Sequence, residues 1–176
     1  YLGKGSQFRR KSWFKRIIHG DWQSSPKNEK YTIDIRNAVR NMAQEKTGAL
    51  IVFARTSQMQ SYADTGVELD AKISTKLIES IFEKNSPLHD GAVIIASKLI
   101  HAASCTLPIS ENPDLPNRIG LRHKSAVGIT EQSDAMCVVV SEETGLVSIA
   151  ERGQIDMGVS LETLTIKVKS YFEESD

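Results

Sequence analysis

Hydrophobic residues along this chain follow two spacings, which predict two kinds of element. Apolar residues three or four positions apart predict helices, and a hydroxyl residue just before them is a typical N-cap. This pattern occurs after Thr32, Ser74 and Ser160. Short continuous apolar runs predict strands that are covered on both faces. These runs are residues 49–53, 92–96, 99–105, 136–140 and 146–150.

The order of these elements predicts the fold class. Ser97 and Lys98 separate two of the runs and favour a tight hairpin, and residues 143–145 favour a turn between the last two runs. Helices alternate with the other runs, so we expect an α/β fold in which a mixed central β-sheet is flanked by helices on both sides. Gly48 stands where the first helix should end in a left-handed residue. The proline-containing stretch 108–118 is expected to be a long loop, and such loops often have functional roles.

Length and composition fit one globular domain with a substantial core. The chain has 176 residues, of which 40% are hydrophobic and 25% charged. No apolar run approaches the roughly 20 residues that a membrane helix needs, and no secretory signal pattern is present. Because the first residue is Tyr1 and not Met, we expect a soluble fragment of a longer protein. Cys105 and Cys137 lie in apolar runs and are expected to be buried thiols rather than a disulfide or a metal pair.

The net charge of zero hides a strongly basic N-terminal segment. Residues 1–30 contain eight Lys or Arg against two acidic residues, so the rest of the chain is acidic. Aromatic residues such as Trp13 and Trp22 lie between the basic ones. We expect residues 1–30 to be either a membrane-proximal segment on an anionic membrane surface or a linker, and residues 31–176 to be the globular domain. Residues 23–28 are expected to be a flexible join.

A carboxylate beside a glycine is the first candidate for chemistry. Asp90 and Gly91 come between a predicted helix and a predicted strand, where the turns of α/β folds commonly build sites. The Asp90 carboxylate could polarise a hydroxyl or hold a divalent metal ion, and the imidazole of His89 could ligate the same ion. The alternative is a turn aspartate that bonds to its own backbone.

A basic cluster is the second candidate. Arg122, His123 and Lys124 are expected to open a helix that runs to about residue 131. The N-terminus of a helix favours anions, and a guanidinium there adds charged hydrogen bonds, so this cluster could hold a polyphosphate. A basic first turn on a surface helix is the alternative, although cations are unfavourable at that position. Glu142 and Glu143, after another predicted strand, are either oxygen ligands or part of a solvated turn.

Taken together, these segments resemble the diadenylate cyclase (DAC) domain, the family that condenses two ATP into cyclic di-AMP. The resemblance covers roughly residues 33–155 and rests on segments 47–52, 87–92, 107–108, 122–124 and 140–145. It implies a DAC-like mixed sheet with helices on both sides. It also implies a nucleotidyltransferase that uses a divalent metal ion, which could be Mn, Mg or Co.

The resemblance assigns roles to individual residues. Asp90 is implied to be catalytic, and Glu143 is favoured over Glu142 as a ligand of the metal or the nucleotide. The implied metal ligands are His89, Asp90 and Glu143. The residues implied to bind nucleotide are Gly91, Ala92, Leu107, Pro108, Leu121, Arg122, His123, Lys124, Ser141 and Glu143.

Partners and location are also implied. Two ATP molecules must lie antiparallel to each other, which a face-to-face homodimer achieves by symmetry. Many family members carry transmembrane helices just before this domain, so we expect a longer, membrane-anchored bacterial protein with the domain at the cytoplasmic face. ATP and cyclic di-AMP are the expected ligands, and no nucleic-acid partner is expected.

The chain departs from the family pattern at three positions. Lys124 stands where arginine is usual, Leu121 where threonine often stands, and Thr106 where many members have tyrosine. Lysine keeps the charge but lacks the planar fork of a guanidinium. These changes leave open a non-catalytic module that binds ATP or cyclic di-AMP. Two further alternatives are a peripheral membrane protein built on the basic segment and a metal-dependent phosphodiesterase, for which four scattered histidines are a poor ligand set.

Overall fold

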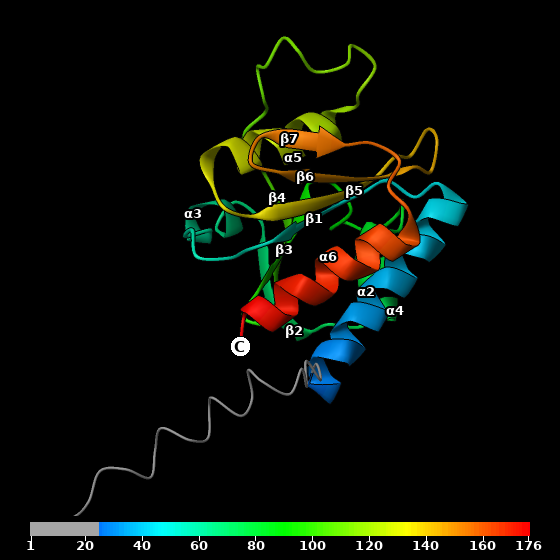
Figure 1. Cartoon of the computed structure of the whole chain (residues 1–176), viewed down its shortest axis with the longest axis vertical. Coiled ribbons are helices and arrows are strands. Elements are labelled where there is room, and N and C mark those ends of the chain that lie inside the picture. The colour runs from blue at the N-terminus through cyan, green and yellow to red at the C-terminus, as the bar shows by residue number, and fades with distance from the viewer. Residues whose placement is uncertain (1–24) are drawn as a thin grey trace, which may run out of the picture.

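A seven-stranded mixed sheet forms the centre of the structure, a computed structural model that describes residues 25–176 (Figure 1). The strands are β1 (Ala49–Phe53), β2 (Val67–Lys72), β3 (Ala92–Ala96), β4 (Leu99–Cys105), β5 (Met136–Val140), β6 (Val147–Glu151) and β7 (Gln154–Asp156). They lie in the order β2-β4-β3-β1-β5-β6-β7. β1 and β3 are parallel, and the other neighbouring pairs are antiparallel. The predicted mixed sheet is confirmed.

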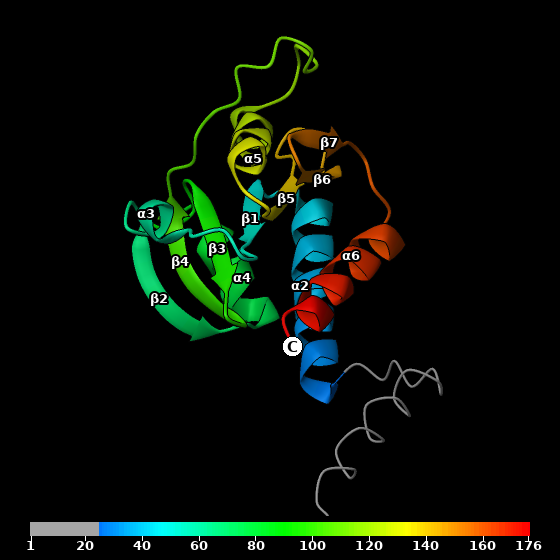
Figure 2. The same cartoon turned by 60° about the vertical axis from the view of Figure 1, so that its left-hand side comes forward.

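Helices cover both faces of this sheet, as predicted. α2 (Pro26–Glu45), α4 (Thr75–Phe82) and α6 (Leu161–Glu174) pack on one face, and α3 (Gln60–Ala63) and α5 (Leu121–Gln132) pack on the other (Figure 2). Successive residues of a strand point to opposite faces, so each strand serves both cores. In β1, Ile51 and Phe53 belong to the core under α2, whereas Leu50 and Val52 belong to the core under α5.

The β3–β4 hairpin turns through Ser97 and Lys98, as the sequence predicts. Both residues have positive φ, 50° and 61°, which is the backbone of a type I′ turn. At the far end of the hairpin, Ala92 pairs with Cys105. The turn before β3 and the loop after β4 therefore meet at one edge of the sheet.

Helix α2 begins earlier than predicted. Ser25 is its N-cap and accepts a hydrogen bond from the backbone N–H of Asn28 at 3.2 Å. Asn28 is buried, and its amide donates to the carbonyl oxygen of Phe172 at 3.2 Å and to Asp176 at 2.5 Å. The prediction of a flexible join is therefore wrong from residue 25 onward, and the domain starts before residue 31. The rest of the basic aromatic segment, residues 1–24, lies outside the described residues.

The end of α2 also differs from the prediction. Lys46, not Gly48, is the left-handed C-cap, with φ of 52° and ψ of 42°. Its backbone N–H donates to the carbonyl oxygens of Met42 and Ala43 and closes the last turn. Gly48 instead lies close to two side chains of the candidate site, Arg122 and Glu142.

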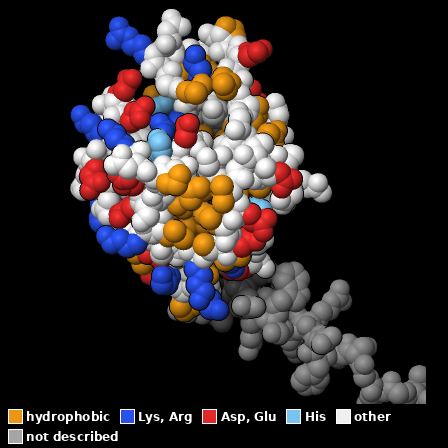
Figure 3. Space-filling view, turned by 180° about the vertical axis from the view of Figure 1, so that it is seen from behind, with side chains coloured by type: hydrophobic (Ala, Val, Ile, Leu, Met, Phe, Trp, Pro, Cys, Tyr) orange, Lys and Arg blue, Asp and Glu red, His pale blue; other side chains and the backbone are white. Residues whose placement is uncertain are grey.

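Sequence analysis missed α3 and the two edge strands. β2 exposes most of its residues and contains a bulge between Glu68 and Ala71, and β7 is three residues long and largely exposed. Short, polar or bulged edges protect a sheet from pairing with other chains, and they lack the apolar run that marks a central strand. Figure 3 shows the molecule from behind relative to Figure 1; a broad hydrophobic patch lies near the centre of this face, with charged side chains around it.

Both cysteines are buried and free, as predicted. Burial raises the pKa of the Cys105 thiol to about 11, so it stays protonated at neutral pH. Within residues 25–176, no helix has both the length and the apolar character to cross a membrane.

Asn28→Ala tests whether the first turn of α2 belongs to the domain. The change removes the two hydrogen bonds that tie α2 to the C-terminal end of α6. We expect the free energy of unfolding to fall by about 1–3 kcal/mol, measured by denaturant titration. Lys27→Ala, at an exposed neighbouring position, is the control and should change little. Equal stabilities of the two variants would contradict the role given to Asn28.

Candidate functional site

The turn before β3 fixes the position of Asp90. The carbonyl oxygen of Ser86 accepts from the backbone N–H of His89 at 3.3 Å and from ring Nδ1 of His89 at 2.7 Å. A carbonyl can only accept, so Nδ1 is the donor, and in the neutral ring this leaves Nε2 as the acceptor. Gly91 has φ of 96°, and a Cβ there would lie 2.7 Å from the carbonyl oxygen of Cys105. Only glycine fits this close approach of β3 and β4.

Asp90 is exposed, and no hydrogen bond joins its carboxylate to the described part of the chain. The alternative of a turn aspartate bonded to its own backbone therefore has no support in residues 25–176. The carboxylate is free to meet a ligand.

Asp90 and Arg122 line the same cavity, of about 610 Å³. Aliphatic side chains form one part of its wall, and charged or polar side chains form another. Ligand sites commonly combine an apolar wall with a few polar groups in this way. The lining residues are Leu50, His89, Asp90, Gly91, Ser104, Cys105, Thr106, Leu107, Ile109, Leu121, Arg122, Ser125 and Glu142.

Arg122 reaches this cavity by passing Gly48, the residue just before β1. A Cβ on Gly48 would lie 2.7 Å from Nη1 of Arg122 and 3.1 Å from Cβ of Glu142. Nη1 also pairs with the Glu142 carboxylate at 3.4 Å. Glycine at position 48 leaves the space in which the guanidinium lies between β1 and the β5–β6 turn.

The Arg122–Glu142 pair also borders a second, smaller cavity of about 170 Å³. The N-terminus of α5 lies at this cavity: Gly120 is the N-cap, and no side chain caps the helix. The first N–H groups of α5 therefore lack a capping side chain and can bind an anion. The other lining residues are Arg118, Ile119, Leu121, His123, Val140, Ser141, Glu143, Thr144, Leu146 and Met157.

Buried polar atoms without a partner concentrate at this second cavity. Among the described residues, four buried side-chain nitrogen or oxygen atoms lack a hydrogen bond. Three of the four are Nε of Arg122 and the two ring nitrogens of His123. Buried polar groups in proteins are almost always paired, so this concentration makes the second cavity a candidate site for a polar ligand.

His123 is not a cation at neutral pH. Burial lowers its pKa, the positive charge of Arg122 lowers it further, and Glu143 opposes the shift only in part. The neutral ring offers one donor and one acceptor. Of the three basic positions predicted from sequence, Arg122 is therefore the one that brings positive charge to the cavities.

Most of the predicted site residues line one of the two cavities. The larger one has His89, Asp90, Gly91, Leu107, Leu121 and Arg122, and the smaller one has Leu121, Arg122, His123, Ser141 and Glu143. Three predicted residues line neither. Ala92 is fully buried in β3, Pro108 packs against Gly128 of α5, and the carbonyl of Lys124 accepts from the N–H of Ser110 at 3.0 Å. The roles of all these residues stay predictions.

Sequence reasoning underrated two features of the site. It ranked Glu142 below Glu143, yet Glu142 lines both cavities and pairs with Arg122. It also missed Arg118, which belongs to the long loop. Two adjacent glutamates in a sequence do not indicate which of the two side chains will lie beside the arginine.

The predicted metal ligands are not gathered in one place. Within residues 25–176, no three His, Cys, Asp or Glu side chains converge on a point. His89 and Asp90 share the larger cavity, whereas Glu143 lines only the smaller one. His89 and Asp90 could still share a divalent ion, because a carbonyl holds Nδ1 of His89, as is usual for metal-binding histidines, and Nε2 has no hydrogen-bond partner within residues 25–176.

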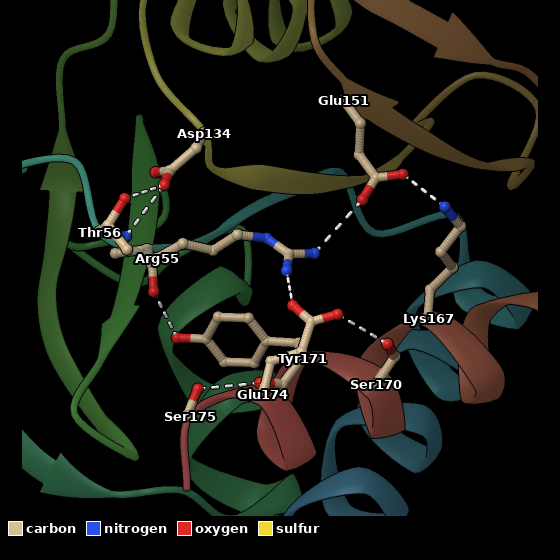
Figure 4. Close-up of polar contacts among 10 residues, drawn as sticks. Arg55, Thr56, Asp134, Glu151, Lys167, Ser170, Tyr171, Glu174 and Ser175 are labelled. Carbon is tan, nitrogen blue, oxygen red and sulfur yellow. Dashed lines mark hydrogen bonds and ion pairs between the residues drawn. The ribbon is translucent and has the colours of Figure 1, made fainter.

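A third cavity, of about 1020 Å³, lies at the opposite end of β1, beside Arg55, and its charged side chains pair with one another (Figure 4). Arg55 bridges Glu151 and Glu174 there, and Lys167 pairs with Glu151 at 2.5 Å. Burial would raise the pKa of Asp134, but hydrogen bonds from Thr56 and Ser57 hold it well below its usual value. These charges satisfy one another, which indicates a structural network.

Comparison with known proteins identifies the family. The family model described as "DisA bacterial checkpoint controller nucleotide-binding" (DAC) matches residues 36–155. This chain belongs to the DAC family. The resemblance inferred from the sequence motifs is thus confirmed.

Curated relatives of this DAC chain include two named for cyclic di-AMP chemistry. Cyclic di-AMP synthase CdaA of Bacillus subtilis is 42% identical over 141 residues, which are 80% of this chain and 52% of the relative. A diadenylate cyclase of Listeria monocytogenes is 42% identical over 164 residues, which are 93% of this chain and 56% of the relative. The chain therefore spans just over half the length of these relatives.

Solved structures have the same fold. A double cysteine mutant of DacA from Staphylococcus aureus superposes with a TM-score of 0.83 at 40% identity, and the match covers 84% of this chain and 99% of that one. A hypothetical membrane spanning protein from Bacillus cereus gives a TM-score of 0.70 at 38% identity, over 73% of this chain and 63% of that one. The α/β architecture is thus shown independently of the sequence pattern.

The burial of His123 predicts an acid-side loss of stability. Its folded-state pKa lies below the unfolded value of about 6.5, so the unfolded chain binds the extra proton first. Stability should be fully present above pH 6.5 and fall as the pH drops below it. Unfolding titrations between pH 5 and 8 should show a steeper acid-side loss for the wild type than for His123→Gln. Parallel pH profiles of the two proteins would contradict the assignment.

Proposed function

We propose that this chain is the catalytic part of a diadenylate cyclase, which joins two ATP molecules into cyclic di-AMP and releases two pyrophosphates. The observation that carries the proposal is the cavity shared by Asp90 and Arg122, next to the uncapped N-terminus of α5. The names of the relatives from Bacillus subtilis and Listeria monocytogenes support the same chemistry.

The larger cavity suits the nucleoside. Leu50, Leu107 and Leu121 offer apolar surface on which a purine can pack. Asp90 lies in the same cavity as an acceptor for a ribose hydroxyl. Thr106 stands where the family often has a tyrosine, so aliphatic contacts replace ring stacking here.

The smaller cavity suits the phosphates. The free N–H groups of α5, Nε of Arg122 and the neutral ring of His123 provide donors for anionic oxygens. Arg122 borders both cavities and would contact the α-phosphate, which connects the nucleoside to the β- and γ-phosphates. A nucleotide would therefore span the Arg122–Glu142 pair.

The reaction follows from this placement. Asp90 orients the 3′-hydroxyl of one ATP and accepts its proton, while the 3′-oxygen attacks the α-phosphorus of the other ATP. A phosphodiester bond forms, the bond from the α-phosphorus to the bridging oxygen breaks, and pyrophosphate leaves. A second such step closes the ring. Arg122 stabilises the negative charge that develops on the phosphates.

His89 and Asp90 would hold a divalent metal ion of the Mn, Mg or Co type in the larger cavity. Such an ion would neutralise part of the negative charge on a phosphate and would favour ionisation of the ribose 3′-hydroxyl. Glu143, in the smaller cavity, would contact the nucleotide rather than this ion. The three-residue ligand set inferred from the family resemblance is thus reduced to two.

We infer that catalysis requires a face-to-face homodimer, because residues 25–176 of one copy form a single such site and the reaction needs two opposed nucleotides. Exposed apolar side chains around the cavities support this inference. Among the described residues, four of the eight exposed large hydrophobics line them: Ile109, Leu121, Leu146 and Met157. Contiguous exposed apolar surface commonly marks an interface.

We also infer that the full-length protein is membrane-anchored, with this domain at the cytoplasmic face. The relatives are nearly twice as long as the matched region, and one structural relative is described as a hypothetical membrane spanning protein. Residues 1–30, basic and aromatic, would then lie close to an anionic membrane surface.

Asp90→Asn tests the proposed role of the carboxylate. The amide keeps the shape but cannot take the hydroxyl proton, so we expect product formation to fall at least about 100-fold with ATP affinity nearly unchanged. Mass spectrometry of the products and calorimetric ATP titration measure the two effects. Asp114→Asn, on the exposed loop, is the matched control and should keep full activity. Full activity of Asp90→Asn would refute the role, and ATP binding without product in the wild type would favour a sensor module.

The dimer requirement predicts a dependence on protein concentration. Product formed per protomer should fall on dilution through the dimer dissociation constant, because each step needs two copies. ATP bound per protomer, measured at the same dilutions, should stay constant. A constant activity per protomer in solutions that sedimentation shows to be monomeric would contradict the dimer mechanism.

A further inference from the structure

Arg118 is a free cation at the smaller cavity. It lines that cavity together with Arg122 and His123, its side chain is exposed, and it forms no ion pair within residues 25–176. Its backbone is nevertheless held in place. The carbonyl of Pro116 accepts from the N–H of Ile119 at 3.3 Å, and Ile119 is only 8% exposed. An exposed guanidinium thus extends from a turn whose backbone is held by a hydrogen bond and by the burial of Ile119.

Arg118 determines the net charge of the side chains that line the smaller cavity. Arg122 is positive, His123 is neutral, and Glu142 and Glu143 are both negative. Without Arg118 the smaller cavity would carry a net negative charge, and with it the charges cancel. A phosphate chain carries several negative charges of its own, so a net negative cavity would repel it.

We propose that Arg118 binds the β- and γ-phosphates of ATP in the smaller cavity, together with Arg122 and the N-terminus of α5. This inference rests on the proposed function, because it takes ATP as the ligand. A guanidinium can form two parallel hydrogen bonds to a phosphate, which lysine cannot. The side chain of Lys124 lines neither cavity, so a second guanidinium in the smaller one comes from the loop.

The same contact helps the leaving group. Negative charge grows on the pyrophosphate as its bond to the α-phosphorus breaks, and a cation already in place stabilises that charge. Arg118 is exposed at the cavity, so it is positioned to hold the pyrophosphate until it departs. The residue would act on binding and on the chemical step through one interaction.

Calorimetric titration of Arg118→Ala with three probes tests the proposal. Affinity for ATP and for inorganic pyrophosphate should fall about tenfold or more, because each loses a charged hydrogen bond. Affinity for AMP, which lacks the β- and γ-phosphates, should stay unchanged. Arg118→Lys should lie between the wild type and Arg118→Ala. Arg152→Ala, which removes an exposed arginine at the far end of β6, is the matched control and should bind all three probes normally.

Two outcomes would overturn the Arg118 proposal, and a third would overturn only the proposed function. Unchanged ATP and pyrophosphate affinity in Arg118→Ala would show that the side chain does not contact these phosphates. An equal loss for ATP and AMP would show a general effect on the site. If Arg118→Ala weakens ATP binding as expected but the wild type forms no cyclic di-AMP, the proposed function is wrong and the role of Arg118 in phosphate binding is retained.

Discussion

The passage of Arg122 over Gly48 is the constraint on which the candidate site depends. Nη1 of Arg122 lies 2.7 Å from where a Cβ on Gly48 would be, and it pairs there with Glu142. This pair borders both cavities, one with apolar walls and one at a helix N-terminus. Leu121, Arg122 and Glu142 line both cavities, so a ligand with an aromatic ring and a charged tail could meet both environments at once.

The registers of the sheet bring the parts of this site together. Ala49 of β1 pairs with Val140 of β5, and Ala92 of β3 pairs with Cys105 of β4. β1 and β3 are parallel to each other, and their outer neighbours β5 and β4 are antiparallel to them. The starts of β1 and β3 and the ends of β5 and β4 therefore meet at one edge of the sheet. The loops at that edge supply Asp90, Glu142 and the start of α5. Residues far apart in sequence become neighbours through backbone pairing alone.

Sequence reasoning predicted what local pattern encodes. Buried strands such as 49–53 have unbroken apolar runs, and the Ser74 and Ser160 caps bond to N–H groups three residues on, as N-caps do. The reasoning failed where tertiary contacts decide. The burial of Asn28 depends on Phe172 of α6, 144 residues away in sequence, and the close contact at Gly48 is made by a side chain on α5. The edge strand β2 has no apolar run because one side of its ladder is unpaired.

The two polar ends of β1 show why charge density alone does not locate a site. At the Arg55 end, the cation is bound by two carboxylates and Lys167 shares one of them, so the charges need no ligand. At the Arg122 end, one carboxylate takes Nη1 while Nε is buried without a partner, and His123 beside it has two unpaired nitrogens. Leaving such groups unpaired costs free energy that a structural network would have recovered. Their persistence beside an uncapped helix is best explained by a ligand that completes them, which favours the smaller cavity over the larger Arg55 cavity as a place of binding.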